Sequence, residues 1–378
     1  MYIRPLKEYK EAGIPKKFDS TLPQGTITLI DQSGCDKHVA PFLKPNLEAF
    51  ENPERIEMTL QYLEETKSLE GIRTFKTTQA TKEEALLVHK PYLVQSVELM
   101  SELGGGVLGE SAWASEDLWS SAMHALGGAL LAGELAASDT CRHSFALVRP
   151  PGHHATTSSS MGLCFFNNVA ITVRKIQAQN GIKKVSILDI DDHFGNGTSE
   201  IFYEDPNVQF ISIHEYDYIN YGIGHYREMG HGRGLGTNIN IPLHPESPDS
   251  SYKLAMDKIV VPAIERFNPD IIAISAGYDA HFTDPIGEMA VDSKTYWYIA
   301  SMIERLIGTC KMNGSFWVLE GGYNPLTLGP CIRATLEGLQ DKPCPELEDQ
   351  EERDDEEGVA KLNRRIIKRI MNTIFPFI

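Results

Sequence analysis

The sequence has few of the features that mark a secreted or membrane-bound protein. It contains six scattered cysteines in 378 residues and no Cys-x-x-Cys pair, and a chain of this length does not depend on disulfides for its core. No segment reaches the roughly 18 uninterrupted apolar residues of a membrane span, and the first residues lack the apolar core of a secretory signal. We therefore expect a soluble, cytoplasmic protein with reduced cysteines and no membrane contact.

Positive charge is also scarce. The chain has 35 lysines and arginines against 52 aspartates and glutamates, which gives a formal net charge of −17. No basic stripe interleaved with aromatic residues interrupts this acidity. Because such a chain repels phosphate backbones, we expect no direct nucleic-acid binding, and basic or neutral substrates are favoured.

Short β-type runs alternate with segments whose apolar residues have helical spacing. This alternation predicts an α/β fold, in a single domain with a mostly parallel central sheet flanked by helices. A hydrophobic content of 42% can supply one large core for a chain of this length. The predicted strands are residues 26–31, 145–149, 185–190, 208–214, 238–242, 271–275 and 316–320.

The chain changes character after Pro343. A charged run is followed by apolar and basic residues at helical spacing. We predict a main domain over residues 1–345, an acidic linker over 346–358 and an amphipathic C-terminal helix over 359–378, docked on the main domain or on a partner.

Two of the predicted strands are followed by residues that bind metals. Asp191 and His193 come directly after the run 185–188, and Asp279 follows the run 271–274. Open α/β sheets place ligands at the carboxyl ends of their strands. The sequence therefore predicts that Asp191, His193 and Asp279 hold one divalent ion.

Two further segments follow strands. His153 and His154 lie on a turn after the strand 145–149, and imidazole titrates in the range needed for acid–base chemistry. An isolated histidine pair is better explained by local backbone contacts, but the other strand-end residues favour a role in catalysis. Gly321-Gly322-Tyr323 permits a close backbone approach and a phenolic donor to an oxyanion, although this tripeptide is common in plain turns.

These segments, in this order, resemble the histone deacetylase family, which shares the arginase/deacetylase fold with acetylpolyamine amidohydrolases and acetoin-utilisation proteins. The resemblance covers about residues 25 to 340 and implies that residues 1–345 form a deacetylase-like catalytic domain. The matching segments are His38 and residues 51–55, 149–155, 162–168, 189–198, 212–214, 240–243, 275–284 and 319–324.

The resemblance implies a role for each matching residue. His154 would act as general base and then general acid, while His153 tunes the site, and Tyr323 would polarise the acyl carbonyl. Asp189 would orient His153, and Asn196 would orient His154. An asparagine at position 196 is similar to the class II and bacterial branch of the family. It implies one catalytic zinc bound by Asp191, His193 and Asp279.

The resemblance also implies a potassium site and a substrate tunnel. Phe194 stands where the family usually has a second histidine, and Leu163 where it often has a phenylalanine. Phe194 should change the packing beside the metal, and Leu163 should leave room for bulkier acyl groups. The potassium site would comprise Asp189, Asp191, His193, Ser212 and Ile213, although for Ser212 a plain strand-end serine is equally expected. The tunnel would comprise Gly162, Leu163, Tyr221, Ile286, Gly321 and Gly322.

The function that follows is zinc-dependent hydrolysis of an acyl amide, chiefly acetyl, on a lysine side chain by metal-activated water. The substrate would be an acyl-lysine protein or peptide, or a small cationic acyl-amine, and an oligomer is possible. The alternative is an acetylpolyamine or other small-amide deacylase. A two-manganese ureohydrolase needs further carboxylates that Phe194 and residues 280–281 do not supply. A non-catalytic binding protein would not need the intact set of ligands, histidines and Tyr323.

Overall fold

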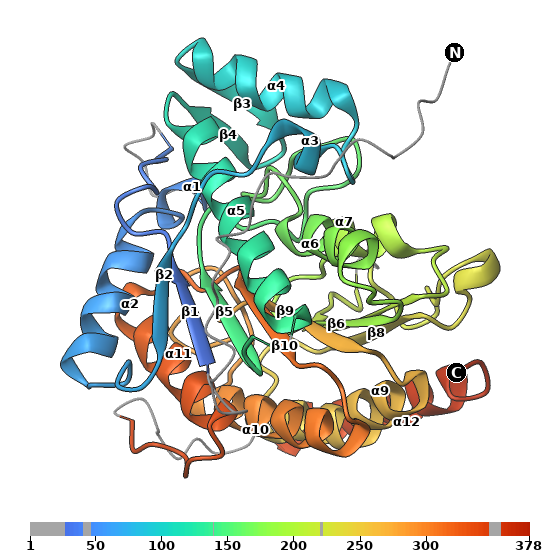
Figure 1. The fold of residues 1–378 in the computed structure, drawn as a ribbon. Coiled ribbons are helices and arrows are strands. Elements are labelled where there is room, and N and C mark those ends of the chain that lie inside the picture. Colours follow the sequence, from blue (N-terminus) through green and yellow to red (C-terminus); the bar gives the residue numbers. More distant parts are fainter. Residues whose placement is uncertain (1–26, 41–46, 139, 220–221, 348–356) are drawn as a thin grey trace.

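A central parallel sheet organises the fold. The computed structural model describes the chain except for residues 1–26, 41–46, 139, 220–221 and 348–356. Eight parallel strands lie in the order β2-β1-β5-β10-β9-β6-β7-β8 (Figure 1). The predicted α/β fold class is therefore confirmed, and each of the seven predicted strands is present. The strands are β1 (Ile27–Asp31), β2 (Arg73–Lys76), β5 (His143–Leu147), β6 (Val185–Asp189), β7 (Val208–Glu215), β8 (Asn238–Leu243), β9 (Ile271–Ala276) and β10 (Ser315–Leu319).

Helices cover both faces of the sheet, so its central strands are buried on each side. Successive residues of a strand point to opposite faces, and Phe145 and Ala146 accordingly belong to different core clusters. One face packs against α5 (Leu118–Ala137), α6 (Asn168–Gln179) and α7 (Asn196–Phe202). The other packs against α2 (Glu54–Glu65), α8 (Asp249–Ala255), the π-helical η2 (Met256–Val260), α9 (Val261–Phe267), α10 (Ser293–Cys310) and α11 (Pro325–Leu339).

A small antiparallel hairpin, absent from the sequence-based prediction, lies outside the main sheet. Its strands are β3 (Gly105–Gly109) and β4 (Ala112–Ser115). Its turn approaches the segment after the tandem histidines, because Glu110 O and Ser111 O accept hydrogen bonds from Gly162 N at 2.9 Å and Leu163 N at 2.7 Å. The remaining short elements are α1 (Leu47–Phe50), α3 (Lys82–Ala85), α4 (Pro91–Glu102) and η1 (Gly232–Gly234).

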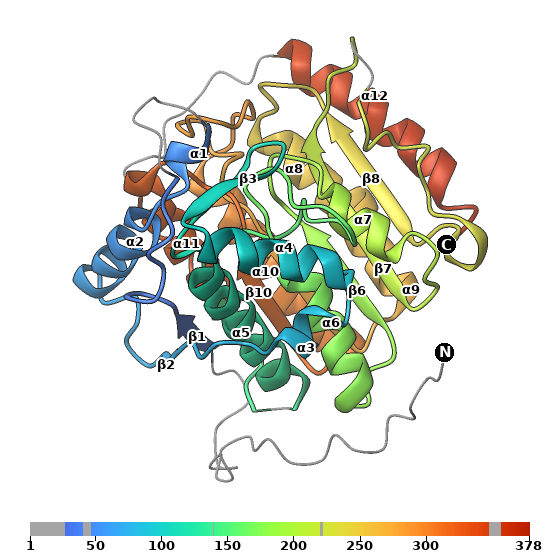
Figure 2. The same cartoon turned by 90° about the horizontal axis from the view of Figure 1, so that it is seen from above.

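A C-terminal helix, α12 (Glu357–Ile374), runs beside the edge strand β8 (Figure 2). Its Asn363 side chain donates to Ser247 Oγ at 2.6 Å and Ser251 Oγ at 2.9 Å and accepts from His244 N at 3.1 Å. Most of the predicted acidic linker lies outside the described residues, so the division of the chain into three parts stays a prediction. Within the described part of the chain, no helix is long and apolar enough to span a bilayer.

Candidate active site

The ends of two neighbouring strands bring the predicted metal ligands together. β6 pairs with β9 in parallel, with Asp189 opposite Ser275, so the segments after both strands leave the same edge of the sheet. Asp191 and His193 follow β6, and Asp279 follows β9. One ligand atom from each of these three residues lies within 4.8 Å of the others. His193 Nδ1 is 3.1 Å from Asp279 Oδ2 and 3.3 Å from Asp191 Oδ1.

The carboxylates of Asp191 and Asp279 are buried, and each accepts a hydrogen bond from a backbone N–H group. Gly321 N–H donates to Asp191 Oδ2 at 2.8 Å, and Asp192 N–H donates to Asp279 Oδ1 at 2.9 Å. A Cβ on Gly321 would stand 2.2 Å from Asp279 Oδ2 and 2.6 Å from Asp191 Oδ2, so only glycine leaves this space open. Burial and the nearby Asp191 carboxylate raise the pKa of Asp279. Two buried carboxylates and one imidazole fit a divalent ion with an open coordination position.

The tandem histidines each have an acceptor on the far ring nitrogen. His153 Nδ1 lies 3.1 Å from Asp189 Oδ2, and His154 Nδ1 lies 2.6 Å from Asn196 Oδ1. The two ring centroids are 4.0 Å apart. Such partners fix the tautomer and leave Nε2 directed away from them.

The environments of these two rings push their pKa values apart. Burial disfavours the charge on His153, but the Asp191 and Asp189 carboxylates outweigh it and raise the pKa of His153 to about 10. Burial and the neighbouring His153 lower the pKa of His154 to about 3. The asymmetry leaves His154 as the neutral ring of the pair, able to accept a proton.

Tyr323 follows the end of β10 and lies in the same pocket as His154 and His193. Tyr323 N–H donates to Asp284 Oδ2 at 2.6 Å, and the Arg55 guanidinium lies 4.6 Å from the centre of the Tyr323 ring. Arg55 Nε also donates to Gly322 O at 2.7 Å. Burial raises the pKa of Tyr323 well above its ordinary value, although Arg55 opposes this, so the phenol stays protonated. It is therefore available as a hydrogen-bond donor.

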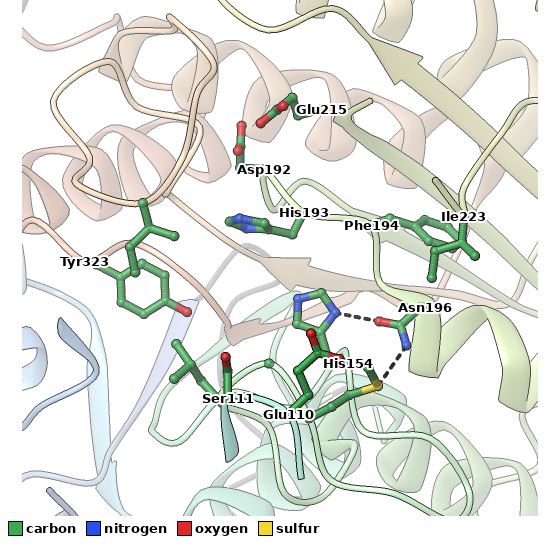
Figure 3. Close-up of a pocket in the computed structure, with 14 residues that line it drawn as sticks. Glu110, Ser111, His154, Asp192, His193, Phe194, Asn196, Glu215, Ile223 and Tyr323 are labelled. Atoms are coloured by element: carbon green, nitrogen blue, oxygen red, sulfur yellow. Dashed lines mark hydrogen bonds between the residues drawn. The ribbon is translucent and has the colours of Figure 1, made fainter. Parts of the chain in front are cut away.

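A pocket of about 410 Å³ joins these groups, and Figure 3 shows the His154, His193 and Tyr323 side chains around it. Three predicted tunnel residues, Gly162, Leu163 and Ile286, line the pocket. Gly321 instead lies beside the predicted metal ligands, and Gly322 is not among the lining residues. Tyr221 lies outside the described residues. The full lining is Glu110, Ser111, His154, Met161, Gly162, Leu163, Asp192, His193, Phe194, Asn196, Glu215, Ile223, Ile286 and Tyr323.

Three residues of the predicted potassium site, Asp189, Ser212 and Ile213, lie on neighbouring strands, and Asp191 and His193 follow β6. Ser212 of β7 is paired with Asp189 of β6, and Ile213 follows it. Ser212 Oγ contacts His214 Nδ1 at 2.8 Å. A bound potassium ion therefore stays a prediction.

Sequence reasoning missed a buried charge network behind the site. Arg149 Nε and Nη2 donate to Glu51 Oε1 at 2.7 Å and Oε2 at 2.6 Å, and Arg55 Nη1 donates to Glu51 Oε1 at 3.1 Å. Glu320 Oε2 accepts from Gly152 N at 2.6 Å and from the backbone of His153 at 3.0 Å. The available signal was the four-residue spacing of Glu51 and Arg55, where Glu51 lies between α1 and α2 and Arg55 lies in the first turn of α2. This network fixes the turn that carries the histidines.

Comparison with known proteins agrees with this arrangement. Residues 49–339 match the histone deacetylase domain. A "Probable deacetylase" of Archaeoglobus fulgidus is 37% identical over 279 residues, which are 72% of this chain and 76% of that protein. The "Histone deacetylase-like amidohydrolase" of Pseudomonas aeruginosa is 33% identical over 260 residues, 69% of this chain and 68% of that protein.

A solved structure has the same fold. The crystal structure of the HDA15 HD domain matches with a TM-score of 0.83 at 28% identity, over 93% of this chain and 95% of that one. Some curated plant relatives are longer, and the chain spans about half of their length. The domain match and the relatives together show that this chain belongs to the histone deacetylase family, as an enzyme of its amidohydrolase type.

Proposed function

We propose that this enzyme hydrolyses an acyl amide, chiefly an acetyl amide, on lysine side chains with one bound zinc ion. The main support is that one ligand atom each of Asp191, His193 and Asp279 lies within 4.8 Å of the other two. His193 lines a pocket together with His154 and Tyr323. A ligand set with an imidazole and two carboxylates suits a catalytic zinc. A potassium ion near Asp189 and Ser212 is a further proposal that rests on the family resemblance.

Each side chain around the pocket has a separate role in the proposed hydrolysis. When bound, zinc supplies Lewis acidity toward the amide carbonyl and lowers the pKa of water. His154, held by Asn196, accepts the proton of the attacking water and returns it to the departing amine. His153, held by Asp189, contributes positive charge beside it. Tyr323 donates a hydrogen bond to the carbonyl oxygen as negative charge develops there.

The pocket supports a cationic acyl-amine as substrate. The net charge of −17 attracts an acyl-lysine protein or peptide as well as a small acylated amine. Ile286 offers an apolar wall, and Leu163 leaves space that longer acyl groups could fill. The alternative within the same chemistry is an acetylpolyamine or other small-amide deacylase. A two-manganese ureohydrolase and a non-catalytic role are less well supported.

One experiment on a zinc-replete sample tests this proposal. Acetyl-lysine peptides, longer acyl-lysines, acetylated polyamines and urea-type substrates would be compared, with metal content measured on the same sample. We expect about one zinc per chain and hydrolysis of acetyl-lysine. A sample that carries zinc but cleaves none of the acyl-lysines would overturn the proposal.

A further inference from the structure

Two carboxyl groups in the pocket have no part in the proposed mechanism. Asp192 stands between the metal ligands that follow β6, and Glu215 is the last residue of β7. Both line the pocket, and Figure 3 shows their side chains next to each other, on the far side of His193 from His154. Glu215 N–H donates to Asp192 O at 2.8 Å, so the backbone itself holds the pair together.

Asp192 is fully buried but incompletely hydrogen-bonded. Its Oδ2 accepts from Glu288 N at 3.1 Å, whereas no donor from the described residues reaches Oδ1. The Glu215 carboxyl group, which is half-buried, contacts it. Two facing carboxyl groups repel each other unless a cation or a shared proton lies between them. A positive charge beside the pair would relieve this repulsion.

Among the described residues, no lysine or arginine supplies that charge. In the described part of the chain, neither Asp192 nor Glu215 forms an ion pair with a lysine or arginine. The pocket lining includes a third carboxylate, Glu110, and neither a lysine nor an arginine among the residues named above. Asp191 and Asp279 balance the two charges of a divalent ion, so that ion leaves Asp192 and Glu215 uncompensated.

We propose that Asp192 and Glu215 form a subsite for an alkylammonium group carried by the substrate. The inference rests on the proposed function, because it assigns part of the same pocket. An alkylammonium has three N–H donors for the free carboxylate oxygens, and Phe194, Ile223 and Ile286 offer apolar surface to its carbon chain. The subsite lies inside the pocket beside a metal ligand. It therefore selects small acyl-amines with a second cationic amine over uncharged amides of equal length.

Paired substrates test this assignment. Monoacetylated linear diamines of increasing length would be compared with N-alkylacetamides of the same length, with kcat/KM measured for each. We expect the charged member to be preferred by about tenfold or more at one favoured length, as charge-assisted hydrogen bonds allow. In Glu215→Gln most of this preference should disappear. Glu110→Gln, which removes one charge from the exposed part of the same pocket, is the matched control and should reduce it much less.

Binding without turnover separates the subsite from the chemistry. The unacetylated diamine would be titrated calorimetrically into zinc-loaded wild type and Glu215→Gln, with zinc content measured for both. We expect about tenfold weaker binding in the variant, with zinc retained. Equal diamine affinity in the two proteins, equal turnover of charged and uncharged substrates, or zinc loss in Glu215→Gln would each overturn the subsite, even if acetyl-lysine is cleaved. Diamine binding that depends on Glu215 in an enzyme that cleaves nothing would uphold the subsite and reject the proposed function.

Discussion

Among single residues, Gly321 matters to the candidate metal site because it has no side chain. Asp191 and Asp279 approach each other in space that a Cβ on Gly321 would occupy, while the Gly321 N–H holds one of the two carboxylates. The family resemblance alone suggested a tunnel contact for this glycine. Its position beside the predicted ligands leaves the space in which the two buried carboxylates approach each other.

We expect Gly321→Ala to weaken metal binding strongly, because its Cβ would lie 2.2 Å from Asp279 Oδ2. The measurement is zinc affinity by competition with a chelator, with a fall of about tenfold or more expected by analogy with other changes just outside the ligands. Gly358→Ala is the matched control, since nothing lies within 4 Å of a Cβ there. Unchanged zinc affinity in Gly321→Ala would show that the carboxylates are not held as described.

Tyr323→Phe removes only the phenolic donor, because the ring, the Arg55 contact and the backbone bond to Asp284 remain. We expect kcat to fall by about 10²–10³-fold, the usual effect of losing one oxyanion donor, with zinc content preserved. Steady-state kinetics and metal analysis on one sample check this. A rate close to that of the wild type would mean that another group stabilises the carbonyl oxygen.

At the scale of elements, the site is built from loops that follow parallel strands. Apolar runs such as 185–190 and 271–275 predicted β6 and β9, and with them the shared edge that gathers the ligands. β2 was missed because Arg73–Lys76 is only four residues long, with a charged residue at each end, and lies at the edge of the sheet. The β3–β4 hairpin was missed because Gly105 and Gly106 give it low strand propensity. Both missed features depend on tertiary contacts more than on local pattern.

Glu51 links several of these elements through its ion pairs with Arg149 and Arg55. Glu51→Gln would leave two buried guanidinium groups with too little negative charge, and we expect the free energy of unfolding to fall by roughly 3–5 kcal/mol. Urea unfolding measures this. The matched control is Glu98→Gln, whose partner Lys82 is 51% exposed, with an expected loss below about 1 kcal/mol. Similar losses in the two variants would show that burial of the network contributes little.

Asn363 is the polar attachment of α12 to the body of the enzyme. Asn363→Ala removes two donated hydrogen bonds and leaves the His244 N–H without its acceptor, so α12 should detach more often. We expect faster amide hydrogen exchange in α12 and β8, with exchange in β6 unchanged. Leu362→Ala, on the exposed side of the helix, is the control. Unchanged exchange in α12 would show that its apolar face alone holds it.

For the whole molecule, sequence patterns predicted the class of fold and several residues around the pocket. They did not predict which of these residues contact one another. Apolar runs and strand-end residues were enough to place Asp191, His193 and Asp279 on one edge of a sheet. They could not show that Asp192 and Glu215 face each other, because that contact depends on the pairing of β6 with β7. They also could not show that Glu51 joins Arg149 across 98 residues of sequence. Long-range register is a property of the packed sheet.

We propose that Asp191, His193 and Asp279 hold one catalytic zinc ion. The zinc content of purified wild type and Asp279→Ala, measured beside acetyl-lysine hydrolysis, tests this proposal. We expect about one zinc per chain in the wild type, and loss of both zinc and activity in a variant that remains folded by circular dichroism. A folded Asp279→Ala protein that keeps its zinc would show that these three residues do not hold the ion.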